Sequence, residues 1–153
     1  MNIDEIRTFI EQLDGVLTLA PGPGDNSPEI AWGDLFFYYA PDGVIPDGQP
    51  FATVVTKDYP DDSASHLDRP EAYRVNLAAG TGEFVRWAGR QPRADGSGDI
   101  DPSTEDVVMP HPIYGDLGWL SVVNPGSSTE SALHDLLRAA HQRARARRER
   151  RES

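Results

Sequence analysis

Residues 52–77 read ATVVTKDYPDDSASHLDRPEAYRVNL, and this stretch decides the architecture expected of the chain. A β-branched apolar run opens it, and a run in which Tyr73, Val75 and Leu77 alternate with other residues closes it. Both patterns are typical of β-strands. Between them lie the only lysine of the chain, Lys57, an acidic loop and a Leu-Asp-Arg-Pro turn. The stretch predicts two strands of one sheet with a polar rim where their ends come together.

Apolar periodicity and turn signals place further elements on either side. An N-terminal helix is expected over 2–13, where the apolar residues recur every three or four positions and Asn2 with Glu5 forms a capping box. A second capping box, Ser127 with Glu130, predicts a long helix that begins at Ser128. A short helix is expected over 82–88, capped by Thr81. The expected strands are 16–19, the consecutive segments 29–32 and 35–40, which are joined or bulged at Gly33-Asp34, and then 51–56, 72–78, 106–109 and 117–123.

This order of elements predicts an α+β fold. Strands cluster in the sequence, and helices stand at the two ends and once in the middle, which favours a curved, mostly antiparallel sheet of about five to six strands with helices packed on one face. Residues 1–142 are expected to form a single domain. Residues 90–105 are expected to form an exposed loop, and residues 143–153 an arginine-rich tail that is frayed or disordered.

The composition indicates a soluble protein. The 153 residues have a hydrophobic content of 38%, include 13 prolines and 14 glycines, and contain no cysteine. The absence of cysteine excludes disulfides and thiolate chemistry. No window approaches the apolar length of a membrane helix, and the acidic, amphipathic N-terminus lacks the pattern of a secretory signal. We therefore expect a cytoplasmic protein without a membrane partner.

Charge is distributed unevenly along the chain. Residues 1–137 carry seven Lys/Arg against twenty-three Asp/Glu, a balance of −16, whereas residues 138–153 carry seven Arg against two Glu, a balance of +5. An acidic body repels nucleic-acid phosphates, so a nucleic-acid contact is expected only through the tail. The candidate polyanion contacts there are Arg143, Arg145, Arg147 and Arg148. The alternative is that these arginines serve the helix dipole and solubility.

Three phrases carry a resemblance at the level of a family. WGDLFFYYAPDG (32–43), FATVVTKDYPDDSASHLDRPEAYRVNLAAG (51–80) and HPIYGDLGWLSVVNPG (111–126) together cover most of the chain. In these phrases the chain resembles an uncharacterised family of proteins of this length from high-GC, actinobacterial-type bacteria, a domain of unknown function. The resemblance implies no activity and no catalytic residue.

A more distant similarity concerns the MmcQ/YjbR-like proteins. Those proteins have an N-terminal helix, a curved antiparallel sheet with a Val-Asn-Leu strand, a strand that carries a Trp, and a C-terminal helix. The chain is similar in this order: Val75-Asn76-Leu77, Trp119 and residues 128–148 occupy the places of the last three features. The resemblance implies an MmcQ/YjbR-like fold, and members of that group have been proposed to bind DNA. The chain departs from their pattern in residues 59–69 and in its long acidic loop.

Polar residues near the two central strands are the first candidates for a binding site. They are Lys57, Asp58, Arg69, Arg74 and Asn76. The two strands bring both ends of the 52–77 stretch together, so these side chains are candidates for a pocket rim. The alternative reading is structural: the acids shape turns, and the arginines pair with them at the surface.

His111 is the second candidate because Pro110 and Pro112 fix its backbone, and Tyr114 and Trp119 are expected near it. A single histidine without a second ligand at helical or strand spacing does not indicate a metal site, so neither a metal nor a cofactor is expected. No serine has the surroundings of a hydrolase nucleophile, and no catalytic residue is selected.

These observations favour a non-catalytic domain that binds a small molecule or a protein partner in a cleft beside the sheet. The aromatic residues expected around that cleft are Trp32, Phe36, Tyr38, Tyr73, Tyr114 and Trp119. Two alternatives stay open. One is a nucleic-acid-binding module that uses the C-terminal arginines, and the other is an enzyme with a site near His111 and Lys57.

Overall fold

A computed structural model describes residues 1–94 and 100–152 of the chain. The expected loop over 90–105 lies partly outside these residues, as does the last residue of the expected tail. The elements, in chain order, are α1 (Ile3–Glu11), β1 (Val16–Leu19), the 3₁₀ helix η1 (Glu29–Ala31), β2 (Leu35–Tyr39), β3 (Ala52–Val55), β4 (Arg74–Ala78), α2 (Thr81–Ala88), β5 (Met109–Pro110), the 3₁₀ helix η2 (Gly115–Leu117), β6 (Trp119–Val123) and α3 (Glu130–Glu152).

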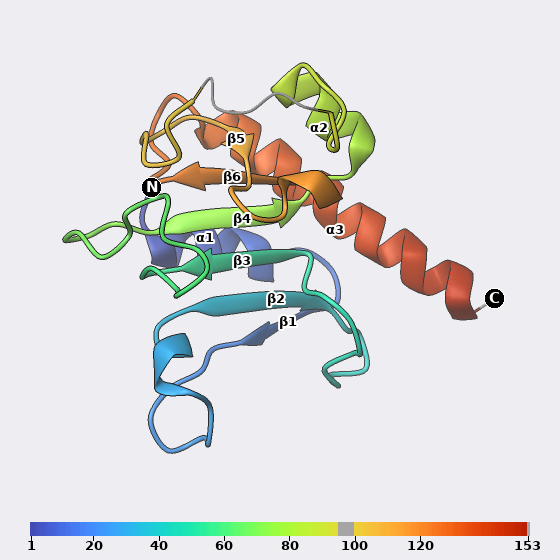
Figure 1. Cartoon of the computed structure of the whole chain (residues 1–153). Coiled ribbons are helices and arrows are strands. Elements are labelled where there is room, and N and C mark those ends of the chain that lie inside the picture. Colours follow the sequence, from blue (N-terminus) through green and yellow to red (C-terminus); the bar gives the residue numbers. More distant parts are fainter. Residues whose placement is uncertain (95–99, 153) are drawn as a thin grey trace.

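The strands form one six-stranded sheet in the order β1-β2-β3-β4-β6-β5, and every pair of neighbours is antiparallel. The sheet lies in front of α1 and α3, which pack on its back, while α2 stands beside β5 and β6 (Figure 1). This arrangement confirms the expected α+β class with an antiparallel sheet. The two strands predicted from residues 52–77 are the central pair, with Val54 opposite Val75.

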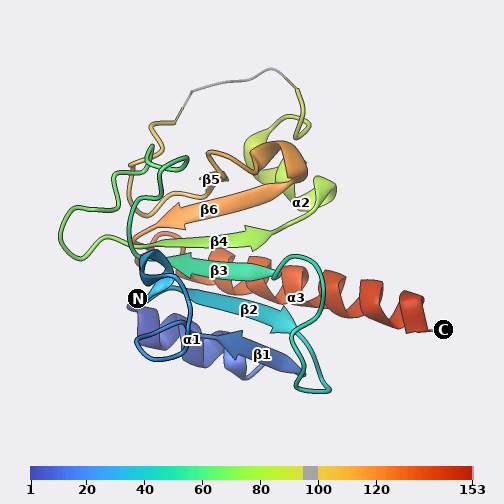
Figure 2. The ribbon, with the colours of Figure 1, turned by 60° about the horizontal axis from the view of Figure 1, so that its bottom comes forward.

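The core lies between the sheet and the two long helices. Strand side chains alternate between the two faces, so every second residue of β2, β3, β4 and β6 faces the side on which α1 and α3 pack. Those residues are fully or nearly fully buried together with the inner faces of the helices; examples are Phe37, Val54, Leu77, Val122, Ile6 and Leu137. The other set of alternate residues faces the opposite side of the sheet. In the described part of the chain, no α-helix lies over that side (Figure 2).

The helix ends show where local sequence decides the structure and where it does not. Asn2 caps α1 with a complete capping box to Glu5, as predicted. The predicted start of α3 at Ser128 is wrong, because the helix begins at Glu130. Asp106, more than twenty residues earlier, accepts hydrogen bonds from the N–H groups of Gly126, Ser128 and Thr129. A carboxylate from another segment thus takes the capping role assigned to Ser127.

The predicted strand over 29–32 is also wrong. The backbone N–H groups of Ala31 and Trp32 donate to the carbonyls three residues before them, of Pro28 and Glu29, and this pattern makes η1 a 3₁₀ turn. Leu117 likewise belongs to η2 rather than to the last strand. The predicted cap at Thr81 is replaced by Gly80, with a φ of 84°, ahead of α2.

Candidate functional site

The uncovered face of the sheet holds a cavity of about 620 Å³. Its floor consists of residues that alternate with the core positions of the central strands: Thr53 and Val55 from β3, Arg74 and Asn76 from β4, and Trp119 from β6. Loops that leave the strand ends rise around this floor and close the sides. The cavity therefore follows from the strand alternation together with four connections between strands, those that join β1 to β2, β2 to β3, β3 to β4 and β5 to β6.

Apolar side chains form the walls and the mouth. Phe36 and Tyr38 of β2 form one wall. Burial raises the pKa of the Tyr38 hydroxyl, which stays protonated at neutral pH. At the mouth, Ile30, Ile113 and Leu117 are 39%, 43% and 63% exposed, which is high for side chains of this size. Apolar surface clustered at an opening is a feature of interaction sites.

Arg74 is the centre of a buried polar network on the floor. Its side chain is 1% exposed, and it pairs with the carboxylate of Asp62 through Nη1–Oδ1 and Nη2–Oδ2 distances of 3.0 and 2.5 Å. Nη1 also donates to the Ser65 hydroxyl at 2.9 Å, and Nε donates to Asn76 at 2.7 Å. Burial alone would raise the pKa of Asp62, but the hydrogen bonds and charge of Arg74 outweigh it and lower the pKa.

The loop between β3 and β4 delivers Asp62 and Ser65 to Arg74. Leu67 and Ala72 of this loop pack with Val55 and Val123 in a second apolar cluster on the cavity side of the sheet. Asp58 fixes the loop, because its carboxylate accepts from the Leu67 N–H at 2.8 Å. The sequence stretch that predicted the sheet thus also supplies the counter-charge of the site.

Asn76 links three strands beneath the cavity. Its amide nitrogen donates to the Thr53 hydroxyl on β3 at 2.9 Å, and its oxygen accepts from Ser121 on β6 at 2.8 Å as well as from Arg74. Every polar atom of this side chain is therefore engaged, and the floor has a fixed arrangement.

His111 stands next to Arg74 and is 5% exposed. Its Nδ1 accepts hydrogen bonds from the backbone N–H groups of Ile113 and Tyr114, both at 3.0 Å. Burial, followed by the charge of Arg74, lowers its pKa to about 3, although Asp62 acts in the opposite direction. A neutral imidazole that accepts at Nδ1 carries its proton on Nε2, so His111 is a fixed donor at Nε2.

Three aromatic rings gather at this point. The His111 ring lies 4.9 Å from that of Tyr114 and 6.3 Å from that of Trp119, and the last two are 6.3 Å apart between centroids. Tyr114 is 47% exposed at the mouth, whereas Trp119 is half-buried. The proximity of these three residues matches the sequence-based expectation.

Lys57 belongs to a separate cluster and does not line the cavity. Its ammonium group lies 2.9 Å from the fully buried carboxylate of Asp34 and donates to the Trp32 carbonyl at 2.8 Å. Asp34 also accepts from the N–H and the hydroxyl of Thr56 and from the hydroxyl of Tyr59. This cluster holds the end of β3 against the segment before β2.

Of the candidate binding residues, five gather at the cavity and three do not. Those that line it are Arg74, Asn76, His111, Tyr114 and Trp119. Lys57 and Asp58 hold loops, and Arg69 donates to the Ser103 carbonyl at an exposed position. Sequence reasoning missed Asp62 as the partner of Arg74, and it missed Thr53 and Ser65. The available signal was two polar residues at alternate positions, Arg74 and Asn76, in a strand that is otherwise apolar.

The C-terminal arginines extend from the body on α3, whose last turns project beyond the sheet (Figures 1 and 2). Arg145 pairs with Asp14 and Glu149, and Arg148 pairs with Asp42 and Glu152. Arg143 donates to the Ala78 carbonyl at 3.1 Å. The helical geometry continues to Glu152, and the fraying expected of residues 143–153 stays a prediction.

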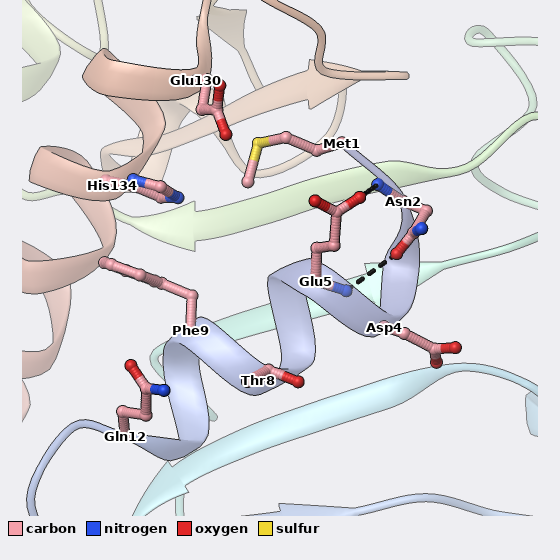
Figure 3. A pocket seen from close by; sticks show the side chains of 9 residues that line it. All are labelled: Met1, Asn2, Asp4, Glu5, Thr8, Phe9, Gln12, Glu130 and His134. Atoms are coloured by element: carbon pink, nitrogen blue, oxygen red, sulfur yellow. Dashed lines mark hydrogen bonds between the residues drawn. The ribbon is translucent and has the colours of Figure 1, made fainter.

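A second hollow of about 430 Å³ lies on the helix side, along α1 and the first turns of α3 (Figure 3). Phe9 and His134 both line it, and their stacked rings contact each other at 4.0 Å between centroids. Two of its polar side chains, those of Asn2 and Glu5, already accept hydrogen bonds from each other's backbone N–H groups in the capping box. This hollow is a seam between two packed helices and offers no set of groups directed at a ligand.

Within residues 1–94 and 100–152, no group of three His, Asp or Glu side chains is arranged to hold a metal ion. None of the helices in the same part of the chain combines the length and the apolar character needed to cross a bilayer.

The fold and the cavity define a small α+β domain with a single sheet that is helix-covered on one face and hollowed on the other. The chain belongs to the family of unknown function DUF6194, whose model matches residues 1–153. The expected membership of a family of unknown function is confirmed. A search of the curated proteins and a search of the solved structures each returned no match, so the similarity to MmcQ/YjbR-like proteins and the origin in high-GC bacteria stay predictions.

Proposed function

We propose that this protein binds a small, largely apolar molecule in the sheet-face cavity and does not convert it chemically. The observation that carries the proposal is a cavity of about 620 Å³ with apolar walls, at which the buried polar side chains Arg74 and Asn76 of the floor lie together with the buried His111 beside them. Ligand sites of roughly 300–1,000 Å³ with apolar linings and a few placed polar groups are the general pattern for small-molecule binding.

The fixed positions of the polar side chains at the cavity support a role in ligand binding rather than a purely structural role for these residues. Arg74 is held by Asp62, Ser65 and Asn76, and His111 by two backbone N–H groups. Such supporting contacts hold donors in place before a ligand arrives, which lowers the entropic cost of binding.

The same contacts count against general-base chemistry at His111. Both ring nitrogens are committed, because Nδ1 accepts two backbone N–H groups and Nε2 carries the proton. Lys57, the partner suggested for an enzymatic site, is engaged with Asp34 and the Trp32 carbonyl. A non-catalytic role therefore agrees better with the positions of these two residues.

The nucleic-acid alternative has fewer charges available than the sequence suggests. Arg145 and Arg148 each bind two carboxylates, and the Arg143 guanidinium bonds a backbone carbonyl. Each carboxylate pair reduces the positive field that a phosphate backbone would meet.

A thermal-shift screen of the full-length chain against metabolites, nucleotides and short peptides tests the proposal. A ligand present at about 100 times its dissociation constant adds about 2.7 kcal/mol, which raises the Tm of a domain of this size by about 5–10 °C. Ala31, at the cavity wall, allows a blocking variant, Ala31→Trp. The matched control is Ala20→Trp, at an exposed position outside the lining.

The expected result is a small-molecule hit that stabilises the wild type and Ala20→Trp but not Ala31→Trp. A hit that stabilises all three proteins equally would place the site elsewhere. If only peptides stabilise the protein, the mouth of the cavity is a site for a protein partner rather than for a small molecule.

A further inference from the structure

We infer that the ligand presents an uncharged carbonyl oxygen to the cavity floor, where one N–H of Arg74 Nη2 and the Nε2–H of His111 both donate to it. The inference rests on the proposed function and names the chemical class of the group recognised there. It follows from counting the donors on the two side chains.

Arg74 has five N–H donors, and four of them have acceptors in the protein. Nε donates to Asn76, Nη1 donates to Asp62 and Ser65, and Nη2 donates once to Asp62. The remaining N–H of Nη2 faces His111 Nε2 at 3.2 Å.

His111 cannot accept that N–H. The N–H groups of Ile113 and Tyr114 both point at Nδ1, so Nδ1 has no proton and the neutral ring carries it on Nε2. The opposite tautomer would place a third N–H against those two backbone donors. The contact between Arg74 Nη2 and His111 Nε2 is therefore one of two donors, and across residues 1–94 and 100–152 no other hydrogen-bond partner is found for Nε2.

Two buried donors that face each other without an acceptor are unfavourable. A single acceptor atom at hydrogen-bonding distance from both nitrogens, to one side of the 3.2 Å line that joins them, would satisfy both. An sp² oxygen suits this position because it has two lone pairs in one plane and no hydrogen of its own to direct at the donors. Arg74 and His111 both line the cavity, so such an oxygen can be carried by a molecule inside it.

The local charges favour a neutral group over a carboxylate or a phosphate. The guanidinium of Arg74 is already matched by Asp62, and Asp61 and Asp62 both line the cavity. A ligand anion would add an uncompensated negative charge to a buried site beside two acids, and such a charge is costly. A ketone, ester or amide oxygen accepts the same two hydrogen bonds without that cost, while the apolar remainder packs on Phe36, Val55 and Trp119.

Three probes of nearly equal shape separate these possibilities: acetophenone, benzoate and α-methylstyrene. They place a neutral oxygen, an anionic oxygen pair or a methylene group at the same position. Each is titrated into the ¹⁵N-labelled full-length protein, and the amide signals of Ile113 and Tyr114 and the indole signal of Trp119 are followed. We expect acetophenone to bind about tenfold more tightly than α-methylstyrene, because it gains about one good hydrogen bond. We also expect it to bind more tightly than benzoate.

The variant His111→Asn keeps an oxygen acceptor for the Ile113 and Tyr114 N–H groups and removes the Nε2 donor. It should weaken acetophenone severalfold and leave α-methylstyrene within about twofold of the wild type, the loss being that of one hydrogen bond. A melting curve checks that the variant is folded, and the order of the three probes on the wild type decides the matter if it is not.

The outcomes distinguish the two proposals. Equal affinity for acetophenone and α-methylstyrene, or tighter binding of benzoate, overturns the carbonyl inference while leaving the cavity as a binding site. If none of the three probes shifts the cavity signals at millimolar concentration, both the carbonyl inference and the proposed small-molecule site are contradicted.

Discussion

Arg74 and Asp62 form a two-point ion pair on the open face of the sheet, with the arginine side chain 1% and the aspartate side chain 15% exposed. The pair joins a central strand to the loop that precedes it, twelve residues away in the chain. Because the arginine has no other carboxylate among the contacts described for it, the charge balance of the cavity floor depends on Asp62.

Replacement of Asp62 by Asn should destabilise the fold by about 2–4 kcal/mol, because removal of one partner leaves a buried charge uncompensated. The loss lies toward the lower end of the range for buried ion pairs because Asp62 is partly exposed. Urea unfolding measures this change. The control is Asp135→Asn, in the exposed pair with Arg138, which should change stability by at most about 0.5 kcal/mol. Equal, small effects of both variants would contradict the role given to Asp62.

Asp106 should behave as the cap of α3 although it lies far away in sequence. Asp106→Ala removes the acceptor for three N–H groups and the Thr129 hydroxyl, and it also places alanine at a φ of 58°. We expect a loss of about 2–3 kcal/mol from the cap and the left-handed backbone together. Asp106→Asn keeps an oxygen and tolerates this φ, so it should cost less than half as much.

Thermal or urea unfolding of the two Asp106 variants checks this prediction, with Asp101→Ala as a control on a loop aspartate whose carboxylate accepts from the N–H and the hydroxyl of Ser103. Equal Tm values for Asp106→Ala and the wild type would show that α3 is capped by its own residues.

His111 should make the fold less stable as the pH falls below its ordinary pKa. The folded chain holds His111 neutral, with its pKa lowered to about 3, whereas the unfolded chain takes up a proton near pH 6.5. Between these values the unfolded state binds more protons, so the free energy of unfolding decreases as pH decreases. From pH 7 to pH 5 the loss from this residue is about 1–2 kcal/mol.

Urea unfolding of the wild type and His111→Asn at pH 7, 6 and 5 measures this loss, and the variant should show the weaker pH dependence. The nitrogen chemical shifts of the ring give a second readout: they should indicate the Nε2–H tautomer throughout this range. A ring that titrates near pH 6.5 would contradict both the burial and the donor assignment.

The C-terminal helix should show little affinity for nucleic acid. Fluorescence anisotropy with labelled single- and double-stranded 20-mers should give weak binding that Arg147→Glu with Arg151→Glu does not change, because the acidic body opposes the approach of phosphates. Micromolar binding that decreases steeply with salt and is lost in the double variant would favour nucleic-acid binding over small-molecule binding in the cavity as the function of this protein.

Most of the fold was predictable because its signals are local. The apolar stripe and capping box of α1 and the alternation in β4 depend on residues within a few positions of one another. The errors occurred where a distant residue or an unusual turn decides the structure. Asp106 sets the start of α3 from another segment, and η1 replaces a strand because its N–H groups find carbonyls three residues back.

The site was predictable only in part for the same reason. Arg74, Asn76 and His111 stand out in sequence because polar residues interrupt apolar strands or lie between prolines. Their partners do not stand out: Asp62 is one of several acids in its loop, and Lys57 turned to Asp34 rather than to the cavity. Which of several similar acidic side chains pairs with a given basic side chain is decided by the tertiary structure, and no periodic pattern in the sequence indicates it.

A crystal structure of the protein grown with the best ligand of the thermal-shift screen tests the central claim most directly. The proposal predicts ligand density over Phe36, Val55 and Trp119, with an uncharged oxygen within hydrogen-bonding distance of both Arg74 Nη2 and His111 Nε2. Density at any other place on the molecule, with the sheet-face cavity closed by its own side chains, would contradict it.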